Sequence, residues 1–233
     1  MIKRFKNIIL VGTSHISKDS IVTVEEAISK YEPTVMALEL DPARFNTLFI
    51  KRNQKKSGLS IKKTGVKGFF FALIGSWIEK RLGKITKSSP GSEMKHAAVL
   101  AQKNKMKIAL IDQHINITLK NISKRITLKE KARFAKDIVK SFFSSLPKDI
   151  DIRRVPKDEQ IASLTLALKE QYPSVYQTII TDRDVYMSKA LYKISIENYK
   201  DNVMAVVGAG HLAGIINQLK REKWPIKNKA KKK

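Results

Sequence analysis

The sequence contains no cysteine. This absence excludes disulfides and thiolate metal sites, so any bound metal ion must be held by His, Asp, Glu or water. Long hydrophobic runs are also absent, because no stretch reaches the roughly 18 apolar residues that a membrane span needs. The apolar run after the basic start is too short for a secretory signal and ends at Gly12-Thr13. We therefore expect a cytoplasmic protein without a signal peptide or transmembrane segment, although a peripheral association with a membrane remains compatible.

Acidic residues are scarce. The chain has 21 Asp and Glu against 46 Lys and Arg, which gives a net charge of +25. The excess is concentrated in residues 51–87 and in the tail after residue 220. Such runs attract anionic membrane surfaces, nucleic acid or acidic partners, and the alternative is a lysine-rich solvated surface. No nucleic-acid-binding motif is present, so we do not expect specific binding of nucleic acid.

One segment, residues 66–82, has the composition of an amphipathic helix. Its apolar residues include a Phe-Phe-Phe run, and Lys67 and the charged residues 79–81 interrupt or end it. Such a helix could cover the core, pack against another subunit of a homo-oligomer, or lie on a lipid surface.

Short apolar runs alternate with longer helical patterns along the chain. We predict strands at residues 7–11, 34–40, 107–111 and 203–207, and helices at 19–31, from 42, 92–104, 128–145, 157–171, 174–199 and from about 211 to 221. This alternation predicts an α/β fold with a largely parallel central sheet flanked by helices. A long helical insertion is expected before the last strand pair, at about residues 127–199. We expect a single domain over residues 1–223, followed by a basic tail at 224–233.

A polar residue stands near the end of each predicted strand. His15 follows the first strand, Glu39 is near the end of the second, Asp112 follows the third and His211 follows the fourth. Ligands of open parallel sheets bind at the carboxyl ends of the strands, so these four residues are expected at one edge. Two His and two carboxylates are adequate ligands for a divalent ion such as zinc, manganese or iron.

Two of these residues lie in Gly-x-x-His turns, at residues 12–15 and 208–211. Gly12 and Gly208 let the backbone turn sharply off a strand and leave room for a ligand. Each turn taken alone is a weak signal. His211 could instead be an ordinary residue at a helix start, and the glycine turn could bind an anion there.

The carboxylates also have purely structural interpretations. Glu39 interrupts an apolar run and is costly to bury without a partner, which Arg44 could supply as a salt bridge. Glu93 near a helix start could complement the helix dipole, and Asp112 could cap a turn. The acid-Arg-acid run at residues 182–184 is predicted within a helix, where such a run often forms a solvated face.

At these residues the sequence resembles the TraB/PrgY (pheromone-shutdown) family, and is most similar to its archaeal members. The matching segments occur in family order at residues 11–20 (VGTSHISKDS), 37–44 (ALELDPAR), 91–94 (GSEM), 110–112 (LID) with 117–120 (ITLK), 182–187 (DRDVYM) and 206–215 (VVGAGHLAGI). Two positions depart from the family pattern: Gln113 stands where an Arg is common, and Asp182 where a Glu is common. Archaeal members often continue into C-terminal membrane helices, whereas this chain ends soon after Trp224-Pro225, as a short member or as one without that region.

The family resembles the Tiki-type metal-dependent proteases and the erythromycin-esterase/ChaN-like fold. The resemblance implies a metal site formed by His15, Glu39 and His211, with Glu39 and Arg183 in catalytic roles. The residues expected to support that site are Gly12, Arg44, Glu93, Asp112, Asp184 and Gly208.

Two functions follow from these patterns. The first is a metal-dependent hydrolase that acts on a peptide or protein substrate and uses a divalent ion (Mn, Co, Zn or Fe). The alternative is a non-catalytic protein that binds and sequesters a peptide or partner at the same place. Pheromone shutdown is compatible with either.

Overall fold

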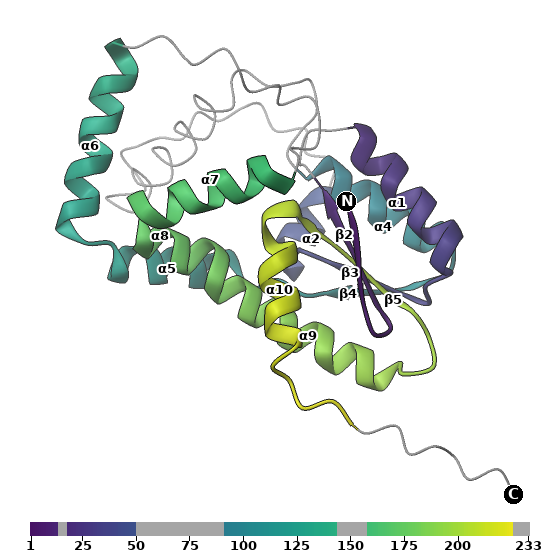
Figure 1. Ribbon diagram of the computed structural model, residues 1–233. Coiled ribbons are helices and arrows are strands. Elements are labelled where there is room, and N and C mark those ends of the chain that lie inside the picture. Colours follow the sequence, from purple (N-terminus) through teal and green to yellow (C-terminus); the bar gives the residue numbers. More distant parts are fainter. Residues whose placement is uncertain (14–17, 50–90, 144–157, 226–233) are drawn as a thin grey trace, which may run out of the picture.

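The computed structural model describes residues 1–13, 18–49, 91–143 and 158–225. The predictions for His15, for the basic stretch with its amphipathic helix at 66–82, and for the end of the basic tail lie outside the described residues. A five-stranded sheet lies at the centre, in the spatial order β1-β2-β5-β3-β4 (Figure 1). The strands are β1 (Ile2–Phe5), β2 (Ile8–Thr13), β3 (Val35–Leu38), β4 (Lys107–Leu110) and β5 (Val203–Gly208). Among the strands of the described residues only β1 is antiparallel to its neighbour, so the predicted α/β fold with a largely parallel sheet is confirmed.

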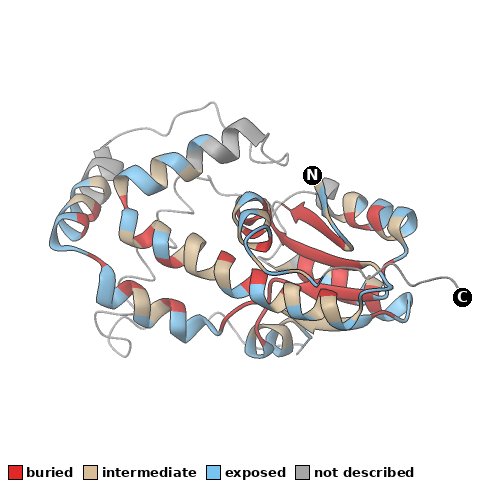
Figure 2. Cartoon of the chain, turned by 60° about the horizontal axis from the view of Figure 1, so that its bottom comes forward, coloured by how far each residue is buried: buried red, intermediate tan, exposed pale blue. Residues whose placement is uncertain are grey.

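Helices cover both faces of the sheet. One face packs against α1 (Lys18–Tyr31), α2 (Pro42–Phe49) and α4 (Ser92–Lys103), and the other packs against α9 (Asp182–Glu197) and α10 (Leu212–Leu219). Every residue of β2 and β5 is buried, which Figure 2 shows as continuous red strands. Strands buried on both faces explain why the sequence shows continuous apolar runs instead of alternation.

The helical region between β4 and β5 extends to one side of the sheet (Figure 1). It contains α5 (Ile115–Arg125), α6 (Leu128–Phe143), α7 (Asp158–Gln171) and α8 (Pro173–Tyr176), and a π-helical turn (Gln177–Thr181) then leads into α9. The predicted helical insertion is therefore present, but it begins at Ile115, before residue 127. In the described chain a single strand follows it, not a pair. Within the described residues, every helix is too short or too polar to cross a membrane.

Within the described residues, two elements were not predicted. The β1 strand pairs with β2 through a tight turn at Lys6, whose φ of 53° is unusual for a residue other than glycine. No Asn-Gly or Asp-Gly pair marks this hairpin. The α5 helix begins at the uncommon N-cap His114, whose ring accepts a hydrogen bond from the backbone N–H of Asn116. Its isoleucines and threonine also have weak helix propensity, which hides the helix in the sequence.

Glu130 connects two helices of the side region. Its Oε2 accepts hydrogen bonds from the backbone N–H and hydroxyl of Thr127 at 2.9 Å each, and its Oε1 accepts one from the backbone N–H of Ser174 at 2.7 Å. Burial alone would raise the pKa of Glu130, but the hydrogen bonds from Thr127 and Ser174 outweigh burial and lower it. One carboxylate thus caps α6 and fixes the start of α8.

We predict that Glu130→Gln destabilises the protein by about 1–3 kcal/mol, because a charge-assisted acceptor of three hydrogen bonds is replaced. The folded pKa lies below the unfolded value of about 4.3, so the contribution is complete above that pH and is lost as pH falls through the folded pKa. Urea unfolding between pH 3 and 7 measures the effect. The difference between wild type and variant should shrink at the acid end, and a difference independent of pH would contradict this assignment.

Candidate functional site

At the carboxyl ends of the neighbouring strands β2, β5 and β3, the chain continues to helices on different faces of the sheet. The helices that follow β2 and β3 pack on one face, whereas α10, which follows the intervening β5, packs on the other. In open α/β sheets, ligands bind at this type of position. Most of the predicted site residues are at this edge.

Glu39 is fixed by the way β3 ends. The last pair of the β3–β5 ladder is Leu38 with Val206, and the chain then turns, with the backbone N–H of Leu40 donating to the carbonyl of Leu38. The backbone N–H of Gly208 therefore donates to the side chain of Glu39, at 2.6 Å from Oε2. This bond orients the buried carboxylate and leaves Oε1 to meet Arg183 and His211.

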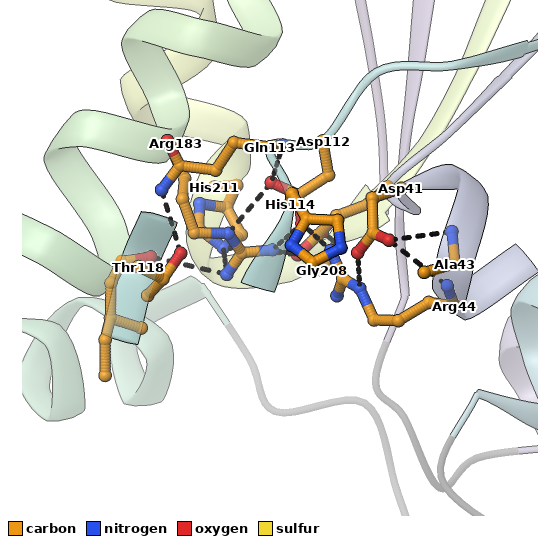
Figure 3. Close-up of polar contacts among 12 residues, drawn as sticks. Asp41, Ala43, Arg44, Asp112, Gln113, His114, Thr118, Arg183, Gly208 and His211 are labelled. Carbon is orange, nitrogen blue, oxygen red and sulfur yellow. Dashed lines mark hydrogen bonds and ion pairs between the residues drawn. The ribbon is translucent and has the colours of Figure 1, made fainter. Parts of the chain in front are cut away.

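Arg183 is the cation partner of that carboxylate. It stands in the first turn of α9, immediately after the π-helical turn, where Figure 3 draws it together with Asp112 and His211. Its Nη2 donates to Glu39 Oε1. Its Nε and Nη2 also donate to Asp112, at 3.1 and 2.7 Å, and its Nη1 donates to the carbonyl of Ile179. Burial alone would lower the pKa of Arg183, but the charge of Glu39 and the bonds to Asp112 raise it above its usual value. The guanidinium is therefore permanently charged.

His211 has a charged partner at each ring nitrogen. Its Nε2 is 3.1 Å from Arg183 Nη1 and 3.4 Å from Glu39 Oε1, and its Nδ1 is 2.6 Å from Asp184 Oδ1. A guanidinium only donates hydrogen bonds, so Nε2 is the acceptor and Nδ1 carries the hydrogen that Asp184 accepts. Burial raises the pKa of Asp184, and its contacts with His211 and Arg183 only partly offset this effect.

A second guanidinium, Arg44, extends the network on the far side of Asp112. Asp41 caps α2 by accepting hydrogen bonds from the backbone N–H groups of Ala43 and Arg44, and it also binds Arg44 Nε at 2.5 Å. Arg44 Nη2 in turn binds Asp112 Oδ2 at 2.5 Å. Burial would raise the pKa of Asp41, but its bonds to Arg44 lower it. Asp112 is thus shared between Arg44 and Arg183, which makes it a bridge and not a simple turn cap.

The described part of the site is acidic, although the chain as a whole is strongly basic. Four carboxylates (Glu39, Asp41, Asp112 and Asp184) face two guanidiniums (Arg44 and Arg183), so acidic side chains outnumber basic ones in the described cluster around His211. In a buried setting this excess favours an additional cation.

The structure brings together most of the residues that the sequence selected. The members of the cluster are Glu39, Arg44, Asp112, Arg183, Asp184, Gly208 and His211. Gly12 lies beside them in β2, paired with Val207, and Glu93 is buried in the first turn of α4. His15 is outside the described residues.

Two structural interpretations of these residues are corrected in part: Glu39 does form a salt bridge, but not with Arg44, and most of the acid-Arg-acid run is buried. Glu39 forms its salt bridge with Arg183, while Arg44 pairs with Asp41 and Asp112. The acid-Arg-acid run is not a solvated face either, because the Arg183 and Asp184 side chains are only 13% and 5% exposed. Asp182 alone behaves as such a residue, with its partner Arg125 near the surface.

The geometry limits how a metal ion could be held. Among the described residues, no group of three or more His, Asp or Glu side chains is placed to hold one. Glu39 Oε1 and His211 Nε2 nevertheless face each other at 3.4 Å. Two ligands about 2.0–2.2 Å from one ion in tetrahedral geometry are separated by a similar distance. These two atoms therefore fit as part of a ligand set, and His15, the third predicted ligand, lies outside the described residues.

Comparisons with known proteins agree with the motifs. The chain is 39% identical over 219 residues to the uncharacterized protein MJ1365 of Methanocaldococcus jannaschii, a match that covers 92% of this chain and 54% of the relative. It is 25% identical over 234 residues to the human TraB domain-containing protein, and 26% over 230 residues to the mouse protein of that name, with 88% of this chain and 61% of each relative covered. The chain thus spans between 54% and 61% of the length of these relatives.

The sequence profile of the TraB/PrgY/gumN family matches residues 2–228, nearly the whole chain. The family resemblance inferred from the motifs is therefore confirmed, and the chain belongs to the TraB/PrgY/gumN family.

Proposed function

We propose that this chain is a metal-dependent hydrolase that acts on peptides, with Glu39 and His211 as metal ligands together with the predicted ligand His15. One observation carries the proposal: Nε2 of His211 faces Glu39 Oε1 at 3.4 Å, while Asp184 Oδ1 contacts Nδ1 at 2.6 Å. Histidines that bind metal ions almost always donate their other ring N–H to a carboxylate, a carbonyl or water. The acid excess of the cluster supports the same conclusion, because it favours a bound cation. The peptide substrate is the expectation that the family motifs raised.

In such a hydrolase, Glu39 and His211 would have distinct roles. A divalent ion held there would supply a Lewis acid that polarises a substrate carbonyl and activates water. The bond from Gly208 N–H to Glu39 Oε2 leaves Oε1 to bind the cation or accept a proton, and Asp184 keeps the lone pair of His211 directed toward the same point.

Arg183 would have to change its contacts when a cation binds. Its guanidinium contacts both Glu39 Oε1 and His211 Nε2, so it would compete with a cation for these two atoms. Its two bonds to Asp112 give it a second anchor toward which it can withdraw. From there it would donate hydrogen bonds to the oxygen that gains negative charge during attack on a carbonyl.

The same contacts favour the alternative function, a peptide-binding protein without catalysis. Because Arg183 already compensates Glu39 and contacts His211, the cluster is partly neutralised without a metal ion. Tight binding of a peptide that is recovered intact, from protein that retains no metal, would support this alternative against the hydrolase.

We predict that the wild-type protein, incubated in turn with Mn²⁺, Co²⁺ and Zn²⁺ and then desalted, retains one of these ions and cleaves a peptide library. His211→Ala and Glu39→Gln should each lower metal affinity by at least about 10-fold, since the first removes a ligand atom and the second removes the negative charge of a ligand. Elemental analysis and mass spectrometry of the peptides measure both effects. His96→Ala is the matched control, because that ring pairs with Glu25 at the surface. Equal retention by wild type and His211→Ala would contradict the proposal.

For Arg183→Gln we predict opposite effects on binding and turnover. Metal retention should persist or increase, because a competing cation is removed from Glu39 and His211. Peptide turnover should fall about 10²–10³-fold, as expected when a donor to a developing oxyanion is lost. Arg125→Gln, which removes the exposed arginine that pairs with Asp182, is the control. If retention and turnover fall in parallel with thermal stability, Arg183 has only a structural role.

A further inference from the structure

Gly214 is an unexpected residue at its position. It lies within α10 (Leu212–Leu219), and glycine inside a helix lowers helix stability relative to alanine. Its backbone is α-helical, so the conformational freedom of glycine is not needed there. Some other constraint must explain the missing side chain.

That constraint is the carboxylate of Asp184. A Cβ atom at position 214 would lie 1.8 Å from Asp184 Oδ2 and 2.5 Å from its Cγ, far inside contact distance. Asp184 projects from α9, which packs against α10, and it is only 4% exposed. Because it is buried, the carboxylate cannot easily move out into solvent. It therefore occupies the space that a side chain at position 214 would fill.

The two oxygens of Asp184 face two positions that lie about one helical turn apart, His211 and Gly214. Oδ1 is 2.6 Å from His211 Nδ1, and Oδ2 lies over Gly214, three residues further along the chain. Residues three apart share a helix face, so a single carboxylate covers both positions. The beginning of α10 is also the positive end of its dipole, which favours a negative charge there.

We infer that Gly214 is a positioning residue: it admits the Asp184 carboxylate, which fixes the tautomer and orientation of His211. With Asp184 in place, the hydrogen stays on Nδ1 and the Nε2 lone pair points toward Glu39 and Arg183. A side chain at position 214 would push the carboxylate away and release the ring. The consequence for metal binding rests on the proposed function, whereas the control of the tautomer does not.

The test is the long-range ¹H–¹⁵N spectrum of the histidine rings in the full chain. The four histidines give few signals, and the signals absent from His211→Gln identify His211. Wild type should show a single tautomer, with a pyrrole-type Nδ1 and a pyridine-type Nε2. Gly214→Ala should lose that single state and give a mixture with hydrogen on Nε2. Gly210→Ala is the matched control, because a Cβ at Gly210 meets nothing within 4 Å.

A double-variant comparison shows whether Gly214 acts through Asp184. Gly214→Ala should lower the melting temperature in the wild-type background. In the Asp184→Ala background it should leave that temperature unchanged or raise it, because the carboxylate that it would meet is gone. Should Gly214→Ala be too unstable for spectra, Asp184→Asn reports on the same contact, since loss of the charge should mix the tautomers.

The inference is overturned if wild type carries its hydrogen on Nε2, if Gly214→Ala keeps the single Nδ1–H tautomer, or if its effect on melting is the same in both backgrounds. On the metal side, Gly214→Ala should weaken retention by about 10–100-fold, as changes behind a ligating histidine do. If wild type retains no metal but shows the clamped tautomer that Gly214→Ala disrupts, this inference stands and the proposed function fails.

Discussion

The rest of the site depends on how the charge of Glu39 is compensated. This carboxylate lies 6% exposed at the end of a central strand, where an unpaired charge would be strongly destabilising. Its compensation comes from a backbone N–H on β5 and from Arg183, which is 144 residues away in the chain. The guanidinium that neutralises Glu39 also binds Asp112 after β4. One side chain from the helical region therefore ties together the ends of two parallel strands.

This dependence explains how a helical region beside the sheet can belong to the site. The π-helical turn before α9 adds one residue to a turn, which rotates the following residues by roughly 100° relative to an uninterrupted helix. Arg183 and Asp184 follow directly, and both point inward. Turns of this type occur frequently at functional sites, and here the extra residue sets which side chains of α9 reach the strand ends.

The sequence predicted the strand-end residues because they need only local information. An apolar run that ends in a charged residue predicts both the strand and the edge at which that residue lies, and this reasoning placed Glu39, Asp112 and His211 correctly with one another. It paired Glu39 with Arg44, a neighbour in sequence, because the spatial neighbour Arg183 lies on a distant helix. Local sequence patterns do not predict a contact between residues that are 144 positions apart. Arg183 was selected by the family motif and not by composition.

Gly214 and the elements β1 and α5 were missed for related reasons. A glycine inside a helix is ordinarily read as a weak point, and only the position of Asp184 reveals what it admits. The hairpin at Lys6 and the His114 cap use residues that rarely mark such turns, so tertiary packing and not local propensity decides these elements.

Consecutive residues of α9 hold His211 from both sides, and this arrangement has a consequence for how the site can change. Arg183 contacts Nε2 and Asp184 contacts Nδ1, so any rotation or shift of α9 alters both ring nitrogens together. The backbone of His211 belongs to the short helical turn between β5 and α10, two elements of the sheet and its core cluster. A shift of the first turn of α9 would therefore act on His211 and on Glu39 Oε1 together, because Arg183 contacts both, whereas Glu39 Oε2 is bound to the backbone N–H of Gly208 on β5. In this architecture the strand ends position Glu39 and His211, and the first turn of α9 supplies the two side chains, Arg183 and Asp184, that contact the ring nitrogens of His211.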